Sequence, residues 1–126
     1  MSEPSEPRRG ISPDNWEKFL QEFSARNAKR RARFNIFFAS GETVEEAEEG
    51  QLESVAIGKD GDKTHVVVKR ADQTADDSDS MIDTIENVRR ITVQIDTDGS
   101  EDVLEITDEK NTLFGLRLES KVDGAS

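Results

Sequence analysis

One apolar stripe near the N-terminus constrains the fold of this chain more than any other feature. Trp16, Phe19, Leu20 and Phe23 recur at i, i+3, i+4 and i+7. Side chains at that spacing line one face of an α-helix, and such a face has to pack against another element to be buried. The spacing predicts a helix from Pro13 to about Lys29.

The residues in front of the stripe are typical of a helix start. Ser12 is a favourable N-cap, Pro13 suits the first helical position, and Asp14 adds a negative charge to the first turn. Ile11, which precedes the cap, is expected to pack on Trp16 as a hydrophobic staple.

After the helix the apolar period changes to two. Phe34, Ile36 and Phe38 occupy alternate positions, which predicts a strand. Phe37 then points to the opposite face, a hint of a second buried face in a closed barrel or a dimer. The acidic stretch Glu42–Gly50 is expected to be an exposed loop or a short helical turn.

Two Asp-Gly pairs mark hairpin turns, because both central residues of a type I′ turn need positive φ. The pairs are Asp60-Gly61 and Asp98-Gly99. The four strands that they join are predicted around Val55–Ile57, Thr64–Arg70, Arg90–Asp96 and Val103–Thr107. Outside these hairpins, the pattern predicts a mobile loop at Ala71–Ser80, a short strand at Met81–Ile85, a turn at Asp108–Asn111 and a last strand at Phe114–Leu118.

These elements predict an α+β fold: one N-terminal amphipathic helix packed on a strongly twisted or half-closed antiparallel sheet of about six strands. The chain has 126 residues, which favours one domain. We expect a disordered tail at residues 1–10, a single α+β domain at residues 11–119 and a flexible tail at residues 120–126.

Part of the sequence resembles a domain-of-unknown-function family of small bacterial proteins. The resemblance spans roughly residues 11 to 118 and rests on Trp16-x-x-Phe19-Leu20-x-x-Phe23-Ser24-x-x-Asn27, the basic run after it, Leu104-Glu105-Ile106 and Thr112-Leu113. The family pattern has a His and a Pro before the last hairpin, and the matching positions here are Asp83 and Val88. The resemblance implies the fold. It implies no activity, because none is established for the family.

Composition argues against several kinds of chemistry. Cysteine is absent, which rules out disulfides and thiolate chemistry, and His65 is the only histidine. The chain carries no phosphate-binding glycine motif and no catalytic motif. We therefore expect no enzymatic activity, no cofactor and no metal site. The polar N-terminus and the short apolar runs argue against a signal peptide and a membrane span, which predicts a cytoplasmic location.

Acidic loops and the lone histidine are weak candidates for a site. Asp96–Asp102 superficially suggests a calcium loop, but its glycine is the fourth residue instead of the sixth. The acidic cluster Asp76–Asp79 is interpreted as a solvated loop. His65 lies on a predicted strand with no partner motif, so it is interpreted as an ordinary strand residue.

A basic run stands out against a net charge of −11. It consists of Arg26, Lys29, Arg30, Arg31 and Arg33. Guanidinium groups bind oxyanions in a bidentate manner, so the run is a candidate surface for an acidic protein partner or, against the overall charge, for nucleic acid. The alternative is structural: cations near a helix C-terminus stabilise the helix dipole and bind the last carbonyls, and these ones can also pair with the acidic loop that follows.

The sequence therefore predicts a non-catalytic protein-interaction or regulatory module that binds an acidic partner or a second copy of itself and no membrane. Nucleic-acid binding through the basic run and a small-ligand-binding or enzymatic domain are the two alternatives.

Overall fold

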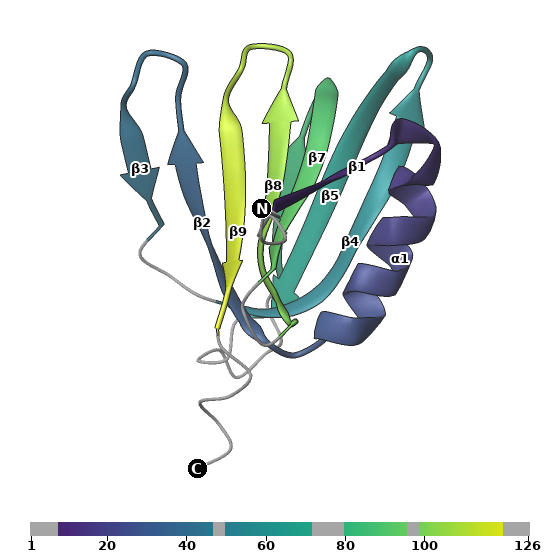
Figure 1. Ribbon diagram of the computed structural model, residues 1–126, viewed down its shortest axis with the longest axis vertical. Helices are drawn as coiled ribbons and strands as arrows, with labels where there is room; N and C mark the ends of the chain where they lie inside the picture. Colours follow the sequence, from purple (N-terminus) through teal and green to yellow (C-terminus); the bar gives the residue numbers. More distant parts are fainter. Residues whose placement is uncertain (1–7, 47–49, 72–79, 96–98, 120–126) are drawn as a thin grey trace, which may run out of the picture.

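The computed structural model describes residues 8–46, 50–71, 80–95 and 99–119. In this part of the chain one helix follows the first strand, and the other strands come after it (Figure 1). The elements are β1 (Arg8–Ile11), a 3-10 turn (Pro13–Asn15), α1 (Trp16–Asn27), β2 (Arg31–Phe37), β3 (Thr43–Glu45), β4 (Gly50–Asp60), β5 (Lys63–Ala71), β6 (Ser80–Ile85), β7 (Val88–Ile95), β8 (Glu101–Asp108) and β9 (Leu113–Leu118).

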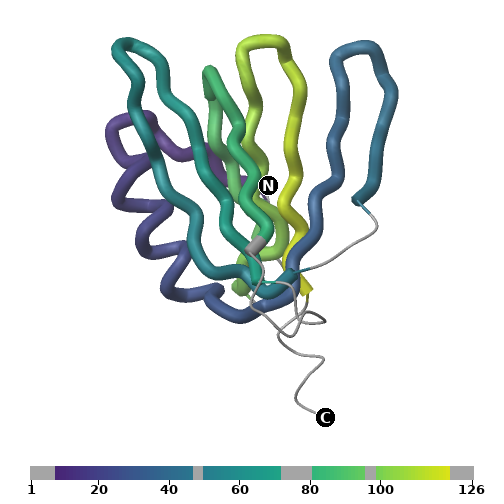
Figure 2. Tube along the Cα trace, turned by 180° about the vertical axis from the view of Figure 1, so that it is seen from behind, coloured from purple at the N-terminus to yellow at the C-terminus, as the bar shows by residue number. Residues whose placement is uncertain are grey.

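All of these strands join one antiparallel sheet with the order β1-β7-β8-β9-β2-β4-β5-β6. Strand β2 changes neighbours along one edge: Arg31 and Ala32 pair with β4, whereas Asn35–Phe37 pair with β3. Seen from behind, the β2–β3 hairpin projects on the side of the molecule away from α1 (Figure 2). The two halves of β2 therefore border different parts of the sheet.

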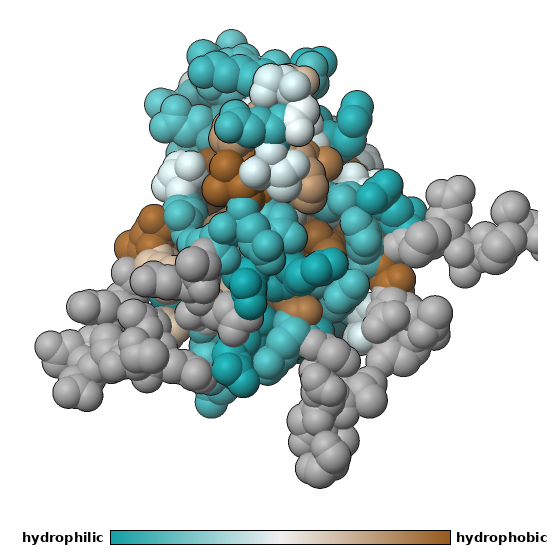
Figure 3. Space-filling model, turned by 90° about the vertical axis from the view of Figure 1, so that its left-hand side faces the viewer, coloured by the Kyte–Doolittle hydropathy of each residue, from teal (hydrophilic) through white to brown (hydrophobic). Residues whose placement is uncertain are grey.

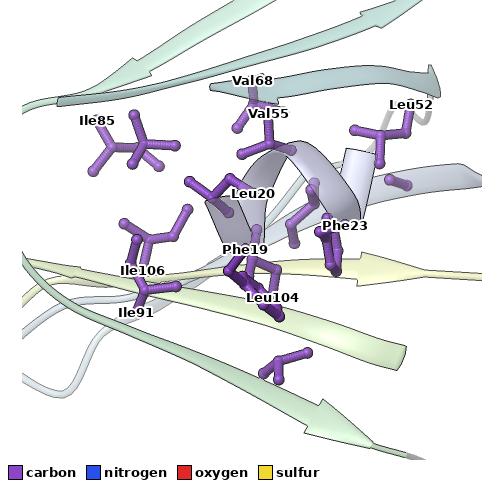
Figure 4. Packing of buried hydrophobic residues seen from close by; sticks show 14 of the residues in the cluster. Phe19, Leu20, Phe23, Leu52, Val55, Val68, Ile85, Ile91, Leu104 and Ile106 are labelled. Atoms are coloured by element: carbon purple, nitrogen blue, oxygen red, sulfur yellow. The ribbon is translucent and has the colours of Figure 1, made fainter. Parts of the chain in front are cut away.

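The core lies between α1 and two parts of the sheet, strands β4, β5 and β6 on one side and strands β1, β7, β8, β9 and β2 on the other. Leu20 and Phe23 of α1 are completely buried. Figure 4 shows them between Val55 and Val68, from β4 and β5, and residues of the β7–β8 hairpin such as Leu104. All five side chains belong to one apolar cluster. The apolar stripe thus packs as its spacing predicts.

The helix is shorter than its predicted span of Pro13 to Lys29. It begins with a 3-10 turn in which the Asn15 N–H donates to the Ser12 carbonyl (2.8 Å), and the Ser12 side chain makes no capping hydrogen bond. The helix ends at Asn27, because Ala28 has an extended ψ of 138° and Lys29 has a φ of +74°, and the Lys29 N–H donates to the Leu52 carbonyl (2.8 Å). Pairing with β4 therefore stops the helix.

The sheet is larger than predicted: among the described residues it has nine strands instead of about six, and within them it is not closed. Two strands were missed. Residues 8–10, which the sequence predicts as part of a disordered tail, belong to β1, and Thr43–Glu45, which it predicts as part of a loop or helical turn, is β3. Both segments are too short and too polar for a pattern to predict a strand, so pairing with a neighbouring strand defines them. Strands predicted elsewhere are present, including Met81–Ile85 within β6.

The first hairpin is confirmed with a different turn. Asp60 pairs with Lys63, so the central residues are Gly61 and Asp62 instead of Asp60 and Gly61. Only the first of the two has positive φ (+68°), an arrangement typical of a type II′ turn. At the second hairpin, β7 and β8 pair as predicted, but Asp98 lies outside the described residues.

Candidate functional site

The basic run does not form one surface. Arg26 lies in the last turn of α1 and binds Glu101 at the start of β8, with its Nη2 2.6 Å from Oε2 and its Nε 3.1 Å from Oε1. This hydrogen bond raises the pKa of Arg26 more than partial burial lowers it, and the charges of Glu101 and Glu22 act in the same direction. Arg26 thus joins the helix end to the sheet.

Arg30 is buried and works as a structural clamp. Its Nη1 donates to Asn27 Oδ1 (2.7 Å) and to the Glu101 carbonyl (2.9 Å), and its Nε donates to the Glu119 carbonyl (3.0 Å). Together these contacts connect the C-terminal end of α1 with the start of β8 and the end of β9. The neighbouring Lys29 is exposed and contributes mainly a backbone hydrogen bond. The structural interpretation of the run therefore accounts for Arg26 and Arg30.

Arg31 and Arg33 lie elsewhere, on the side of β2 that faces away from the core. Arg31 pairs with Glu119 (3.3 Å) and Arg33 pairs with Glu45 (3.7 Å). Ala32 and Phe34, which alternate with them, are buried. Because side chains alternate along a strand, the two arginines point outward.

The register of the sheet brings three further arginines to this outer face. Arg117 of β9 lies directly opposite Arg33. The same cross-strand row continues through Val103 and Gln94 to Arg8 of β1. Arg90 of β7 points to the same side two rows further along, beyond the row of Thr92 and Glu105, since its neighbour Ile91 is buried in the core. We call this surface the arginine face; it consists of Arg8, Arg31, Arg33, Arg90 and Arg117.

Two members of the arginine face are not neutralised by the part of the chain that the structure describes. The side chains of Arg90 and Arg117 make neither an ion pair nor a hydrogen bond there, and both residues are exposed. Arg117 also stands directly across from Arg33. Like charges directly opposite each other on neighbouring strands repel each other, and in this pair the ion pair with Glu45 offsets the charge at Arg33, whereas Arg117 has no such partner in the described structure.

A buried carboxylate lies in the middle of the arginine face. The Glu105 carboxylate of β8 accepts a hydrogen bond from Nε2 of Gln94 (2.8 Å). It also forms an ion pair with Arg8, whose Nε is 2.9 Å from Oε1. Two positions along the same cross-strand row, Asn35 has a buried Oδ1 without a hydrogen-bond partner in the described structure. The centre of the arginine face is thus polar, and its carboxylate, Glu105, is already bound by Gln94 and Arg8.

A second ionic cluster connects the two parts of the sheet. Arg70 of β5 is completely buried, and its guanidinium binds Glu46 (2.8 and 3.1 Å), Asp83 (2.9 Å) and the Ala32 carbonyl (3.0 Å). Its Cζ lies 4.9 Å from the centre of the Phe34 ring. Burial acts to lower the pKa of Arg70, but the hydrogen bonds from it to both carboxylates outweigh burial and raise the pKa.

The pKa of Glu46 moves in the opposite direction. Burial acts to raise it, but the hydrogen bonds from Arg70 and from the Phe34 N–H, with the charges of Arg70 and Arg33, bring it below its usual value. Glu46 is therefore held as a carboxylate. Asp83, the position where the resembled family has a histidine, is the third member of this cluster.

The other candidates from the sequence yield no site. His65 packs over Gly58, where an added Cβ would clash with its imidazole ring. No group of three or more His, Cys, Asp or Glu residues within the described ranges is placed to hold a metal ion. Asp76–Asp79 and part of Asp96–Asp102 lie outside these ranges. No helix within them is long and apolar enough to cross a membrane.

Comparison with known proteins gives no match to a family model, a curated protein or a solved structure. The resemblance to a bacterial family thus stays a prediction. The residues of its helix motif have roles in this fold: the four apolar ones are core, Ser24 binds the backbone of β4, and Asn27 joins α1 to Glu101. The motif therefore consists of residues that stabilise the fold.

Sequence reasoning missed Arg8, Arg90 and Arg117 as companions of Arg33. The alternation in β9 shows that Arg117 points away from Leu116 and Leu118. Which strands lie next to β9 depends on the order of the sheet, and no local pattern reveals it.

Proposed function

We propose that this protein is a non-catalytic protein-interaction module that binds an acidic segment of a partner protein on the arginine face. The observation that carries the proposal is the exposed Arg117, whose side chain has no partner in the described structure and which stands directly opposite Arg33. A bound carboxylate relieves the repulsion of such a pair and forms bidentate hydrogen bonds with guanidinium groups. A cytoplasmic location is part of the same proposal.

Charge distribution supports this choice. The whole chain has a net charge of −11, so most of its surface repels an acidic partner, and the partner is oriented toward the arginine face. The same net charge disfavours nucleic acid, whose backbone is negative along its whole length.

The state of the buried acids argues against catalysis. A general acid or base needs a carboxyl group that is available to a substrate. Glu105 and Glu46 instead have their oxygens bound by arginine, glutamine or backbone groups. These carboxylates hold strands together, which fits a binding module better than an enzyme.

The test measures binding of fluorescein-labelled polyglutamate by fluorescence anisotropy at several salt concentrations. We expect the native protein to bind and the affinity to fall as salt rises, because exposed charges are screened. The double variant Arg90→Ser/Arg117→Ser is expected to bind at least about tenfold more weakly, a loss of about 1.4 kcal/mol. Lys63→Ser/Lys69→Ser is the matched control, since it removes two exposed lysines from β5.

The control is expected to bind within about twofold of the native protein. Equal losses in the two double variants would mean that only net charge matters and would contradict the proposal, as would a native protein that does not bind. Tighter binding to a single-stranded oligonucleotide than to polyglutamate would favour the nucleic-acid alternative instead.

A further inference from the structure

Strand β3 has one edge that no other strand covers within the described part of the chain. It pairs with β2 through Ile36–Val44 and the positions on either side. Hydrogen bonds from Phe38 N to Glu42 O and from Glu46 N to Phe34 O, both 2.9 Å, show which opposite residues of the two strands are hydrogen-bonded pairs. Because hydrogen-bonded pairs alternate in an antiparallel ladder, Val44 bonds to β2, and the backbone groups of Thr43 and Glu45 point outward.

Large apolar side chains flank this edge. Within the described ranges, the exposed large apolar residues are Phe37 (44%), Phe38 (40%), Val44 (45%) and Ile82 (59%). The first three belong to the β2–β3 hairpin. Figure 3, which looks at the molecule from the β3 side, shows apolar residues at the surface among hydrophilic ones. Protein edge strands are usually short and charged; β3 is short and carries Glu45, but exposed apolar side chains lie beside it as well.

The charge of the edge specifies what can cover it. Glu42 and Glu45 are exposed beside the apolar residues, and the side chain of Glu45 is 65% accessible. A second copy of this strand would bring the same glutamates to the contact. Basic side chains are complementary to them, and outward-pointing backbone N–H and C=O groups are satisfied most directly by another strand.

We infer that the β2–β3 hairpin is a second binding site, where an extended segment of a partner protein with alternating apolar and basic residues adds as a strand beside β3. This site goes beyond the proposed function, because it lies on the sheet edge instead of the arginine face and selects the opposite charge. Val44 and Phe38 supply apolar contact, the glutamates select the charge, and Thr43 and Glu45 supply the backbone hydrogen bonds.

The test uses a capped synthetic peptide of alternating valine and lysine, with a valine–glutamate peptide as the charge control. Binding is measured by isothermal titration, and the site is located by amide hydrogen exchange. We expect the lysine peptide to bind, the glutamate peptide to bind at least about tenfold more weakly, and the amides of Thr43 and Glu45 to gain protection.

Two variants separate the edge from the rest of the protein. Thr43→Pro removes an outward N–H without removing a bond to β2, since Thr43 N–H points away from it. It is expected to weaken binding at least about tenfold, and Val44→Ser is expected to do so with the backbone unchanged. Arg90→Ser/Arg117→Ser is expected to leave peptide binding intact, so this inference and the proposed function fail separately.

Several results would overturn the inference: unchanged binding by both edge variants, protection at β1 or β6 instead of β3, or equal affinity for the two peptides. A protein that dimerises through this edge in sedimentation experiments would also overturn it, because a second copy would then be the occupant.

Discussion

The hydroxyl oxygen of Ser24 on α1 lies 2.8 Å from the backbone nitrogen of Val55 on β4 and 3.1 Å from its carbonyl oxygen. It accepts the Val55 N–H and has the Leu20 carbonyl (2.7 Å) as a second acceptor for its own proton. Beyond Leu52 this edge of β4 is bordered by α1 and by no strand in the described structure. One side chain thus satisfies backbone groups that a neighbouring strand would otherwise bind.

Replacing Ser24 with alanine is expected to destabilise the protein by about 1–3 kcal/mol, because the Val55 N–H would lose its partner beneath the helix. Urea unfolding followed by circular dichroism measures the change. Ser40→Ala, in the exposed hairpin turn, is the control and is expected to cost less than about 0.5 kcal/mol. Equal costs for the two variants would contradict the role given to Ser24.

The two neighbouring arginines Arg30 and Arg31 are expected to differ in their effect on stability. Arg30→Met leaves Asn27 Oδ1 and two backbone carbonyls without their donor and should cost about 2–3 kcal/mol. Arg31→Met breaks a half-exposed ion pair and should cost less than about 1 kcal/mol. Thermal unfolding compares them, and a larger loss at Arg31 would refute the clamp.

Gly50 is expected not to tolerate a side chain. A Cβ there would lie 2.9 Å from Arg70 Cβ and 3.0 Å from the Ala71 carbonyl oxygen, at the point where β2, β4 and β5 meet. Gly50→Ala should therefore destabilise the protein by about 1–3 kcal/mol through overpacking. Gly10→Ala on β1 is the matched control, because a Cβ at Gly10 meets nothing within 4 Å. Chemical unfolding of both variants tests the difference.

The Arg70–Glu46 pair predicts a pH-dependent part of the stability. The pKa of Glu46 is lowered in the folded protein, so its contribution is fully present above the usual carboxyl pKa of about 4.3 and is lost as pH falls through the lower folded value. The stability difference between the native protein and Glu46→Gln should shrink over that acidic range. Urea unfolding at a series of pH values measures it.

The control for this prediction is the same comparison in an Arg70→Met background. Without the guanidinium, the main groups that lower the pKa of Glu46 are gone, and burial acts in the opposite direction. The difference should then no longer shrink as the pH falls. A shrinkage of the same size with and without Arg70 would show that the pair does not cause it.

The sequence alone determined the elements whose patterns are local. The stripe from Trp16 to Phe23 predicts the helix and its buried face, since helical spacing places these residues on one side whatever they contact. Alternation predicts the longer strands and the inward position of Leu104 and Ile106 for the same reason. Gly61 marks a turn because few other residues adopt its positive φ.

Tertiary structure alone decided which elements meet. Strands β1 and β3 have no strand pattern of their own, so pairing with β7 and β2 defines them. The basic run is contiguous in sequence, yet it divides between a buried clamp at Arg30 and the arginine face at Arg33. Arg117 joins that face from another strand. Strand register depends on contacts distant in sequence, and those form only when the whole sheet packs against the helix.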